Sequence, residues 1–339
     1  MRQQLIALLL GEVDREVRGE IFPSAPGKSK PVYYETAVPR QVIIGEEPAS
    51  IDGRRITFRV RGYAPDVLLI EARLDVESLF DQGTFGLEEK IYREAYRILE
   101  EQGGSRLFSE EYSIFTVSGY QGPPEPFLEH ASVMASLLKS EGLDLDPKEV
   151  ERTLEAQIKY GMNDLAIVDW DGAFLFDAED DFDEDIELLV LANLQLLRHR
   201  ILDRQLDERL LRLSEVMAKT AGGRSFRRRE LAADLREIIA IRTSAISALQ
   251  RLERNVKLIG DWYSARLFGL AGAKFRLESW RASIRTKLES VEDLYSMVAE
   301  NFSVSTQHRV EWYQIIAFFV LQVGWFLLII LEFWYFTRH

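Results

Sequence analysis

Side chains that could carry out catalysis or bind a metal are few in this chain of 339 residues. The absence of cysteine excludes a thiolate nucleophile, a disulfide framework and cysteine-ligated metals, and the four histidines lack the spacing of metal ligands. Asp169 and Asp171 could form a carboxylate pair for a hydrolase, but the Asp-Gly step at 171–172 already predicts a hairpin turn there. No nucleotide-binding or protease motif is present. We therefore expect no enzyme, no cofactor and no metal.

A run of acidic residues raises the question of a cation site. Eight of the eleven residues from 177 to 187 are Asp or Glu, and the spacing of Asp177, Glu179 and Asp181 resembles a calcium loop. Phe182, however, stands where such a loop needs glycine, and Leu188 stands where it needs a bidentate glutamate. The run instead indicates the start of a long helix, where acidic residues interact favourably with the positive end of the helix dipole.

The charge is distributed unevenly. The net charge is −13, and residues 1–180 contain 19 Lys+Arg against 34 Asp+Glu, whereas residues 181–339 contain 23 against 21. This excess of acid argues against nucleic acid as a partner, because phosphate binding needs a cationic surface. An acidic N-terminal part that recruits a protein partner fits better, although the sequence does not identify that partner.

The pattern of the first 180 residues predicts an acidic α+β domain, and a ferredoxin-like arrangement is one form that it allows. All ten prolines lie in the first 147 residues, so long unbroken helices are expected only after them. The run Leu5–Leu10 is too short to span a membrane and predicts a buried strand. Further strands are expected at 32–36, 41–44, 56–60, 67–74 and 112–117, helices at 87–101, 127–138 and from 147, and a hairpin at 164–177.

Residues 184–305 are predicted to form a coiled-coil-like stalk of long helices. The first helix covers about 184–220 and ends at Gly222-Gly223, and a second covers about 227–268. A third helix has an apolar residue at every seventh position, so it requires a partner helix, either within the chain or in another subunit. These residues are Leu277, Ile284, Val291 and Val298.

Four arginines near the glycine turn could hold RNA or an acidic partner, or could simply be a solvated turn; they are Arg224, Arg227, Arg228 and Arg229.

Residues 311–336 are predicted to form a transmembrane helix. The segment has the roughly 20 apolar residues needed to cross a bilayer, with aromatic residues at both ends. A polar amide near its middle, Gln322, indicates self-association, since it finds no water in lipid. With no export signal and a short tail after the helix, we expect a single-pass protein in contact with membrane lipid, with its N-terminal domain in the cytoplasm. The anchoring and assembly residues would be Trp312, Gln322, Trp325, Glu332 and Trp334.

Two resemblances to known families bear on function. Gly161-Met162-Asn163 matches the signature tripeptide of the CorA-type magnesium channels, although it lies about 150 residues before the apolar segment. The segments at 288–302 and 307–333, with Arg309, Glu311, Trp312 and Glu332, resemble the end of the required-for-meiotic-nuclear-division family, a group of largely unknown function. That resemblance implies a membrane-tethered, non-catalytic organising protein.

These observations together predict a membrane-anchored scaffold or assembly factor. The acidic domain would recruit a partner, the helical stalk would form a homo-oligomer, and the terminal helix would hold the assembly in the membrane. A divalent-cation channel or transporter component of the CorA type is the alternative, in which a pore forms only by assembly of several chains.

Overall fold

The computed structural model describes residues 1–21, 40–81, 83–221, 236, 239–240, 243, 246–247 and 262–337. For 213, 215–221, 294–295, 297–311 and 335–337 it describes the backbone alone. The chain forms two compact units, which we describe separately. Unit 1 comprises Met1–Gln205 and Ser247–Ile284, and unit 2 comprises Leu206–Ile246 and Arg285–His339.

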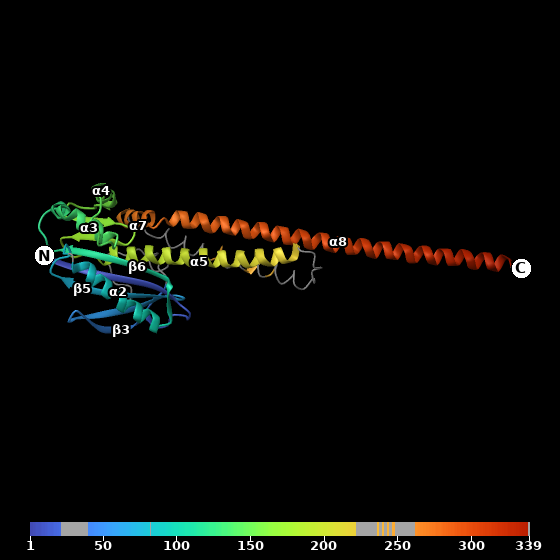
Figure 1. Ribbon diagram of the computed structural model, residues 1–339, viewed down its shortest axis with the longest axis horizontal. Coiled ribbons are helices and arrows are strands. Elements are labelled where there is room, and N and C mark those ends of the chain that lie inside the picture. The colour runs from blue at the N-terminus through green and yellow to red at the C-terminus, as the bar shows by residue number, and fades with distance from the viewer. Residues whose placement is uncertain are drawn as a thin grey trace. The chain divides into compact units, whose positions relative to one another are not determined.

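Unit 1 is built on one mixed sheet, part of which is labelled in Figure 1. Its strands follow the order β2-β3-β4-β5-β1-β6-β9-β8-β7. Neighbouring strands are antiparallel except β6 and β9, which are parallel. The strands are β1 (Arg2–Val13), β2 (Glu20–Ile21), β3 (Gln41–Ile51), β4 (Arg54–Tyr63), β5 (Val67–Val76), β6 (Gly104–Ser118), β7 (Gln157–Ile158), β8 (Asp164–Val168) and β9 (Gly172–Asp177).

The central strand β1 explains why Leu5–Leu10 is apolar without alternation. Leu5 and Leu9 point to one face of the sheet and pack in one apolar cluster, whereas Leu8 and Leu10 point to the other face and pack in a second. Each of these side chains is 0% exposed. A strand buried on both faces reads as a continuous apolar run, so the predicted buried strand is confirmed.

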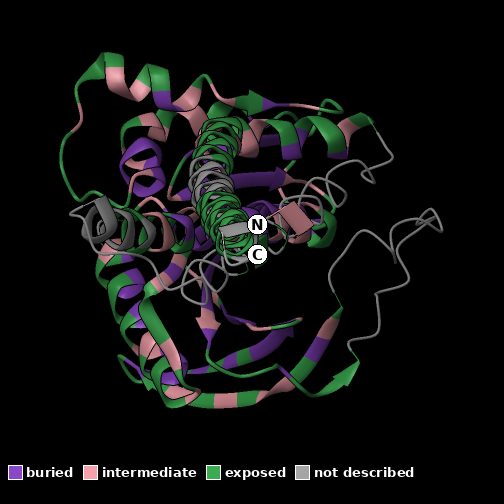
Figure 2. Ribbon diagram, turned by 90° about the vertical axis from the view of Figure 1, so that its right-hand side faces the viewer, coloured by how far each residue is buried: buried purple, intermediate pink, exposed green. Residues whose placement is uncertain are grey.

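Helices cover both faces of this sheet. On one face lie α2 (Gly83–Glu101) and α3 (Ala131–Leu138), which follows the short 3₁₀ helix η1 (Glu125–His130). On the other face lie the start of α5 (Asp183–Ala221) and α7 (Trp262–Lys274). Figure 2 shows the resulting layers of buried residues on strands and helices alike. The remaining helices are α4 (Pro147–Leu154) and α8 (Leu277–Thr337).

The long helix α5 runs in the same direction as α7 and the start of α8. The Tyr263 hydroxyl donates to the carboxylate of Asp185 at 3.1 Å, and the Ser283 hydroxyl donates to Asp203 at 2.8 Å. The residue numbers increase in the same direction on both sides of these two contacts, so α5 is parallel to α7 and the start of α8. The predicted start and end of the first long helix agree with α5 to within about one residue.

The predicted seven-residue repeat forms a buried face where its side chains are described. Leu277 is 3% exposed, and Ile284 and Val291 are each 0% exposed. Within unit 1 the neighbouring helix is α5 of the same chain, as the Ser283 contact shows. Within unit 2 the Lys287 ammonium contacts the Asp207 carboxylate of α5 at 2.7 Å. A long coiled coil is not shown among the described residues.

The α+β domain with a sheet and the apolar helix at the C-terminal end are confirmed. The sheet domain does not follow the β-α-β-β-α-β order of a ferredoxin-like fold, because five strands precede the first long helix. The predicted strand at 32–36 and most of the helix at 227–268 lie outside the described residues. The division into 1–180, 184–305 and 311–336 stays a prediction.

Candidate functional site

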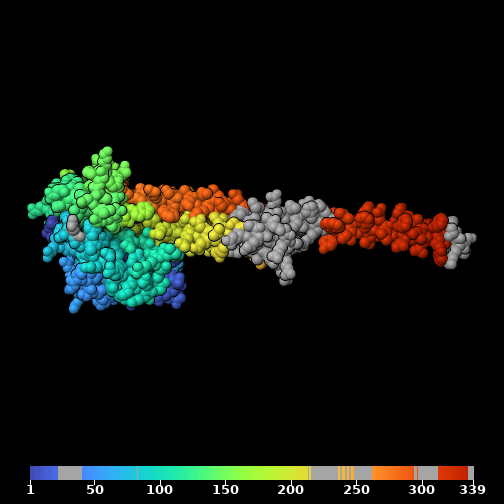
Figure 3. Space-filling view, in the orientation of Figure 1, coloured from blue at the N-terminus to red at the C-terminus, as the bar shows by residue number. Residues whose placement is uncertain are grey.

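The first candidate site is the apolar part of α8. Trp312–Trp334 is 23 residues long with a mean hydropathy of 2.4, and 0% of it is buried in the protein. At a rise of about 1.5 Å per residue it is about 34 Å long, against roughly 30 Å of bilayer hydrocarbon. These residues form the red segment of Figure 3 that ends near the C-terminus. Among the described residues it is the one helix long and apolar enough to cross a membrane.

Water is an unfavourable surrounding for such a helix. Leu321 is 74% exposed and Phe319 62%, and large apolar side chains lie on every side of the helix. Burying one such side chain is worth roughly 1.5–3 kcal/mol, so the segment as a whole stands to gain on the order of tens of kcal/mol in lipid. By contrast, an amphipathic helix would expose one polar face.

The residues predicted to anchor and assemble the chain all lie on this exposed helix. The exposed fractions are 65% for Trp312, 71% for Trp325 and 54% for Trp334. The amide of Gln322 and the carboxylate of Glu332 are exposed as well. The four arginines Arg224, Arg227, Arg228 and Arg229 lie outside the described residues, so their predicted role stays a prediction.

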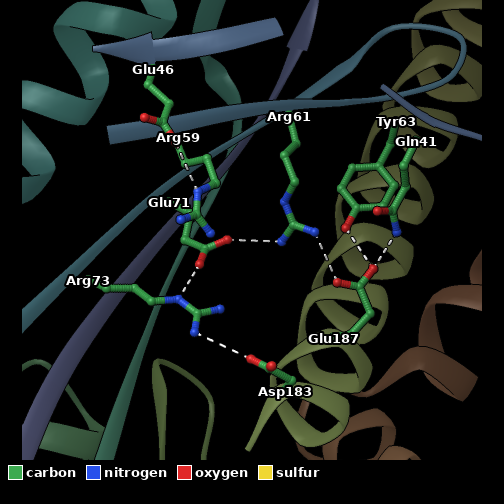
Figure 4. Close-up of polar contacts among 9 residues, drawn as sticks. All are labelled: Gln41, Glu46, Arg59, Arg61, Tyr63, Glu71, Arg73, Asp183 and Glu187. Atoms are coloured by element: carbon green, nitrogen blue, oxygen red, sulfur yellow. Dashed lines mark hydrogen bonds and ion pairs between the residues drawn. The ribbon is translucent and has the colours of Figure 1, made fainter. Parts of the chain in front are cut away.

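A second cluster of polar residues lies between the sheet and α5 and is drawn in Figure 4. The Arg61 guanidinium on β4 bridges two carboxylates: it donates to Glu71 on β5 at 3.0 Å and to Glu187 on α5 at 3.2 Å. Glu187 also accepts from the Tyr63 hydroxyl at 3.0 Å and from the Gln41 amide (Figure 4). Arg61 is 5% exposed and Glu71 2%, so this pair is removed from water.

Charge neutralisation within the cluster is strong enough to shift its titration. Burial alone would raise the pKa of Glu71, but the guanidiniums of Arg61 and Arg73 overcome it and hold that pKa below its usual value. Burial and the Glu187 carboxylate raise the pKa of the Tyr63 hydroxyl. Arg73 reaches on to Asp183 in the first turn of α5 at 3.4 Å (Figure 4).

The arrangement ties the start of α5 to the sheet, and its carboxylates are already engaged. Removing one partner of such a buried pair leaves an uncompensated charge, which makes the cluster a strong positional constraint. Sequence reasoning missed it. The one signal in the sequence was the presence of Arg61 and Arg73 among apolar neighbours, directly after one predicted strand and within another.

Asp169 and Asp171 flank the tip of the β8–β9 hairpin, which confirms the predicted turn. The Asp169 backbone N–H donates to the Gly172 carbonyl at 2.8 Å. Glycine is needed at 172 because a Cβ there would lie 2.8 Å from the carbonyl oxygen of Ser113 on β6. The Lys274 ammonium donates to the Asp169 carboxylate at 2.9 Å.

The two aspartates differ in their surroundings. Asp169 is 5% exposed and pairs with Lys139 and Lys274. Burial and the neighbouring Asp169 charge raise the pKa of Asp171 to about 6. A catalytic role for this pair, or its absence, stays a prediction.

Local hydrogen bonds account for the two remaining motifs. The Asp177 carboxylate accepts from the backbone N–H of Glu179 at 2.6 Å, so the acidic run begins as a turn, and its later members Asp183, Glu184 and Asp185 lie in the first turn of α5. The Gly161-Met162-Asn163 tripeptide lies in the turn between β7 and β8, where the Gly161 N–H donates to Asp164 at 2.6 Å. Within the described residues, no group of three or more His, Cys, Asp or Glu side chains is placed to hold a metal ion.

Comparisons with known proteins give a family and a relative. The chain is 27% identical over 280 residues to the "Uncharacterized protein MJ0711" of Methanocaldococcus jannaschii, which covers 83% of this chain and 81% of that protein. No solved structure matches.

The resemblance to the required-for-meiotic-nuclear-division family was wrong, because the match lies in the N-terminal region and to another family. It rested on an apolar helix and its junction, whose composition the bilayer dictates in unrelated anchors. Residues 3–183, which form the sheet and the helices that precede α5, match the family described as "Uncharacterized protein MJ0711, N-terminal domain", and the chain belongs to that family.

Proposed function

We propose that this protein is a membrane-anchored, non-catalytic scaffold that holds its sheet unit at a membrane surface. The observation that carries the proposal is the 23-residue apolar helix Trp312–Trp334, of which 0% is buried. A soluble protein would cover such a surface with its own core. In this proposal the sheet unit lies on the cytoplasmic side of the membrane.

The sheet unit supplies the partner-binding part of the scaffold. Residues 1–180 contain 34 Asp+Glu against 19 Lys+Arg, which favours a partner with a basic surface. A non-catalytic role is supported by two of its buried carboxylates, since Glu71 and Asp169 pair with arginine and lysine side chains. Their hydrogen bonds serve to hold strands and helices together.

Self-association would occur at the apolar helix. Gln322 is exposed near the middle of the segment, where lipid offers no hydrogen-bond partner. A cross-helix amide bond is worth about 0.6–2 kcal/mol in a membrane, enough to bias assembly. The described part of the predicted stalk surface is already used within the chain, since Leu277 and Ile284 are buried.

Membrane fractionation tests the anchoring. The full chain is expected to stay in the membrane pellet after an alkaline carbonate wash. A chain that ends at residue 305 should move to the supernatant with the thermal unfolding of its sheet unit unchanged. Recovery of the full chain in the supernatant would contradict the proposal.

The mass of the complex solubilised in detergent tests the assembly. Gln322→Leu should lower the number of chains per complex, because it removes the amide from the middle of the span. The matched control is Gln314→Leu, which changes an amide near the end of the span, where water is available. A wild-type monomer that captures no partner from solubilised membranes would refute the scaffold.

The channel alternative stays a prediction. No contact among the described residues gives the Gly161-Met162-Asn163 turn a role in a pore. Magnesium flux into liposomes that contain the purified chain would revive it.

A further inference from the structure

A pocket of about 560 Å³ opens in unit 1 where four separate segments meet. It lies beside the C-terminal end of α3, along α4, at the tip of the β8–β9 hairpin and at the α7–α8 junction. Figure 1 shows α3, α4 and α7 gathered at the same end of the unit. The volume falls in the range of about 300–1,000 Å³ that is typical of small-molecule sites.

The lining of this pocket is cationic, although the chain as a whole is acidic. Four basic side chains line it, against the two carboxylates of Glu149 and Asp169. Asp171 also faces Lys139 from the hairpin and reduces this excess without cancelling it. The four basic side chains are Lys139, Arg152, Lys274 and Arg276.

Asp169 fixes the two lysines in place. Its carboxylate accepts from Lys274 at 2.9 Å and lies 3.6 Å from the Lys139 ammonium. Lys139 also pairs with Glu149 at 2.9 Å. Asp169 itself is 5% exposed, so its carboxylate is buried beneath the pocket wall. A ligand anion would therefore meet two lysines that this carboxylate already positions.

The two arginines of the pocket retain free hydrogen-bonding capacity. Arg276 makes no side-chain hydrogen bond or ion pair with any described residue, and Arg152 lies 3.7 Å from its one carboxylate partner, Glu149. Arg276 also has a φ of 51°, in the left-handed region that favours glycine.

The aromatic wall of the pocket suggests what the rest of the ligand is. Trp170 is 40% exposed, lines the pocket and is held edge-on by Phe275, with ring centroids 6.1 Å apart. An exposed indole beside guanidinium groups suits a planar ring attached to a phosphate. We propose that this pocket binds a mononucleotide, with the phosphate on Arg276, Arg152 and the lysines and the base on Trp170.

Calorimetric titration of the full chain in detergent with AMP tests the proposal. Binding is expected at low ionic strength and should weaken as salt is added. Arg276→Gln should weaken it about tenfold, the loss expected for one hydrogen bond to a charged group. Arg93→Gln is the matched control, since Arg93 is an exposed helical arginine outside the pocket, and it should leave the affinity unchanged. No AMP binding, or an unchanged affinity in Arg276→Gln, would overturn the proposal.

A variant that is expected to tighten AMP binding separates an electrostatic effect from a loss of structure. Glu149→Gln removes one of the two lining carboxylates and frees Lys139, so AMP should bind severalfold more tightly. If Glu149→Gln binds AMP more weakly than the wild type, the positive charge of the pocket does not determine the affinity.

Two further ligands identify the class of the phosphate. Adenosine, which lacks the phosphate, should not bind measurably. Glycerol 3-phosphate imitates a lipid headgroup and has no ring to stack on Trp170, so it should bind at least about fivefold more weakly than AMP. Trp170→Ala should weaken AMP binding by about the same factor, because it removes the same stacking contact. Equal affinities for AMP and glycerol 3-phosphate would exclude the nucleotide and assign the pocket to a headgroup.

Discussion

Two apolar runs of this chain have opposite surroundings. Leu5–Leu10 forms the middle of β1, where each of its leucines is 0% exposed, whereas Trp312–Trp334 has 0% of its length buried. The short run is a strand whose two faces are covered by α2 and α3 on one side and by α5 and α7 on the other. The long run is a helix with apolar side chains all around. Apolar composition thus predicts removal from water, while length and secondary structure decide whether protein or lipid replaces it.

Charged residues also differ between unit 1 and the apolar helix. Unit 1 buries charges because they meet opposite charges, as Arg61 does with Glu71 and Glu187. The apolar helix has Glu332, close to its end, as its one charged residue between 312 and 334. A protein interior can therefore supply partners that a bilayer does not.

Breaking the buried charge pair is expected to have the largest effect on stability. Arg61→Leu should lower the free energy of unfolding of unit 1 by about 3–5 kcal/mol, because Glu71 and Glu187 lose the guanidinium that bridges them. Urea denaturation followed by circular dichroism measures this change.

The matched control lies two residues away on the same strand. Arg59 pairs with Glu46 at 3.5 Å with both side chains more than half exposed. Arg59→Leu should therefore change the unfolding free energy by about 0.5 kcal/mol or less. Equal losses in the two variants would show that burial does not set the strength of the Arg61 contacts.

The comparison of the two apolar runs can be tested with the same substitution in each. Leu8→Ala should cost about 2–5 kcal/mol of unfolding free energy, because it leaves a cavity between β1 and the helices. Leu321→Ala removes the same atoms from the exposed helix and should leave the thermal unfolding of unit 1 unchanged. A comparable destabilisation by Leu321→Ala would mean that the tail packs on the core.

A smaller effect is expected from Glu88, a buried glutamate without a cationic partner among its described contacts. Burial raises its pKa from 4.5 to about 7, although the hydroxyls of Ser113 and Ser140 donate to its carboxylate. The folded chain therefore keeps a proton that the unfolded chain releases. The contribution of Glu88 to the unfolding free energy should fall by roughly 2–3 kcal/mol as the pH rises from 4.5 to about 7, and then level off.

Replacing that carboxyl group should reduce the pH dependence. Glu88→Gln is expected to make the fall in unfolding free energy between these two pH values smaller by roughly 2–3 kcal/mol, whereas Glu89→Gln, at an exposed neighbouring position, should keep the wild-type slope. If Glu88→Gln retains the full slope, another group is responsible for it.

Much of the local structure was predictable from the sequence. The apolar run predicted β1, the Asp171-Gly172 step predicted the hairpin, and the acidic start with the glycines at the end predicted α5. These features depend on neighbouring residues, whose spacing and turn chemistry the sequence displays directly. The apolar helix was equally clear, because a long run of apolar residues with the length of a bilayer span is visible in the sequence itself.

Long-range pairings were not predictable. Arg61, Glu71 and Glu187 meet only because β4, β5 and the start of α5 come together in the fold. The pocket around Asp169 likewise joins segments about 100 residues apart, including Lys274 at the far end of α7. A sequence gives the charge of each of these residues but not its partner.

Membrane anchoring requires that Trp312–Trp334 lie in lipid. Because the chain has no native cysteine, a single Leu321→Cys substitution in native membranes can be probed with a water-soluble maleimide. Leu107→Cys, at an exposed position of the sheet unit, is the reference. We predict rapid labelling at 107 and protection at 321 until the membrane is dissolved and the chain is denatured. Equal labelling rates at the two positions in intact membranes would contradict the membrane anchor.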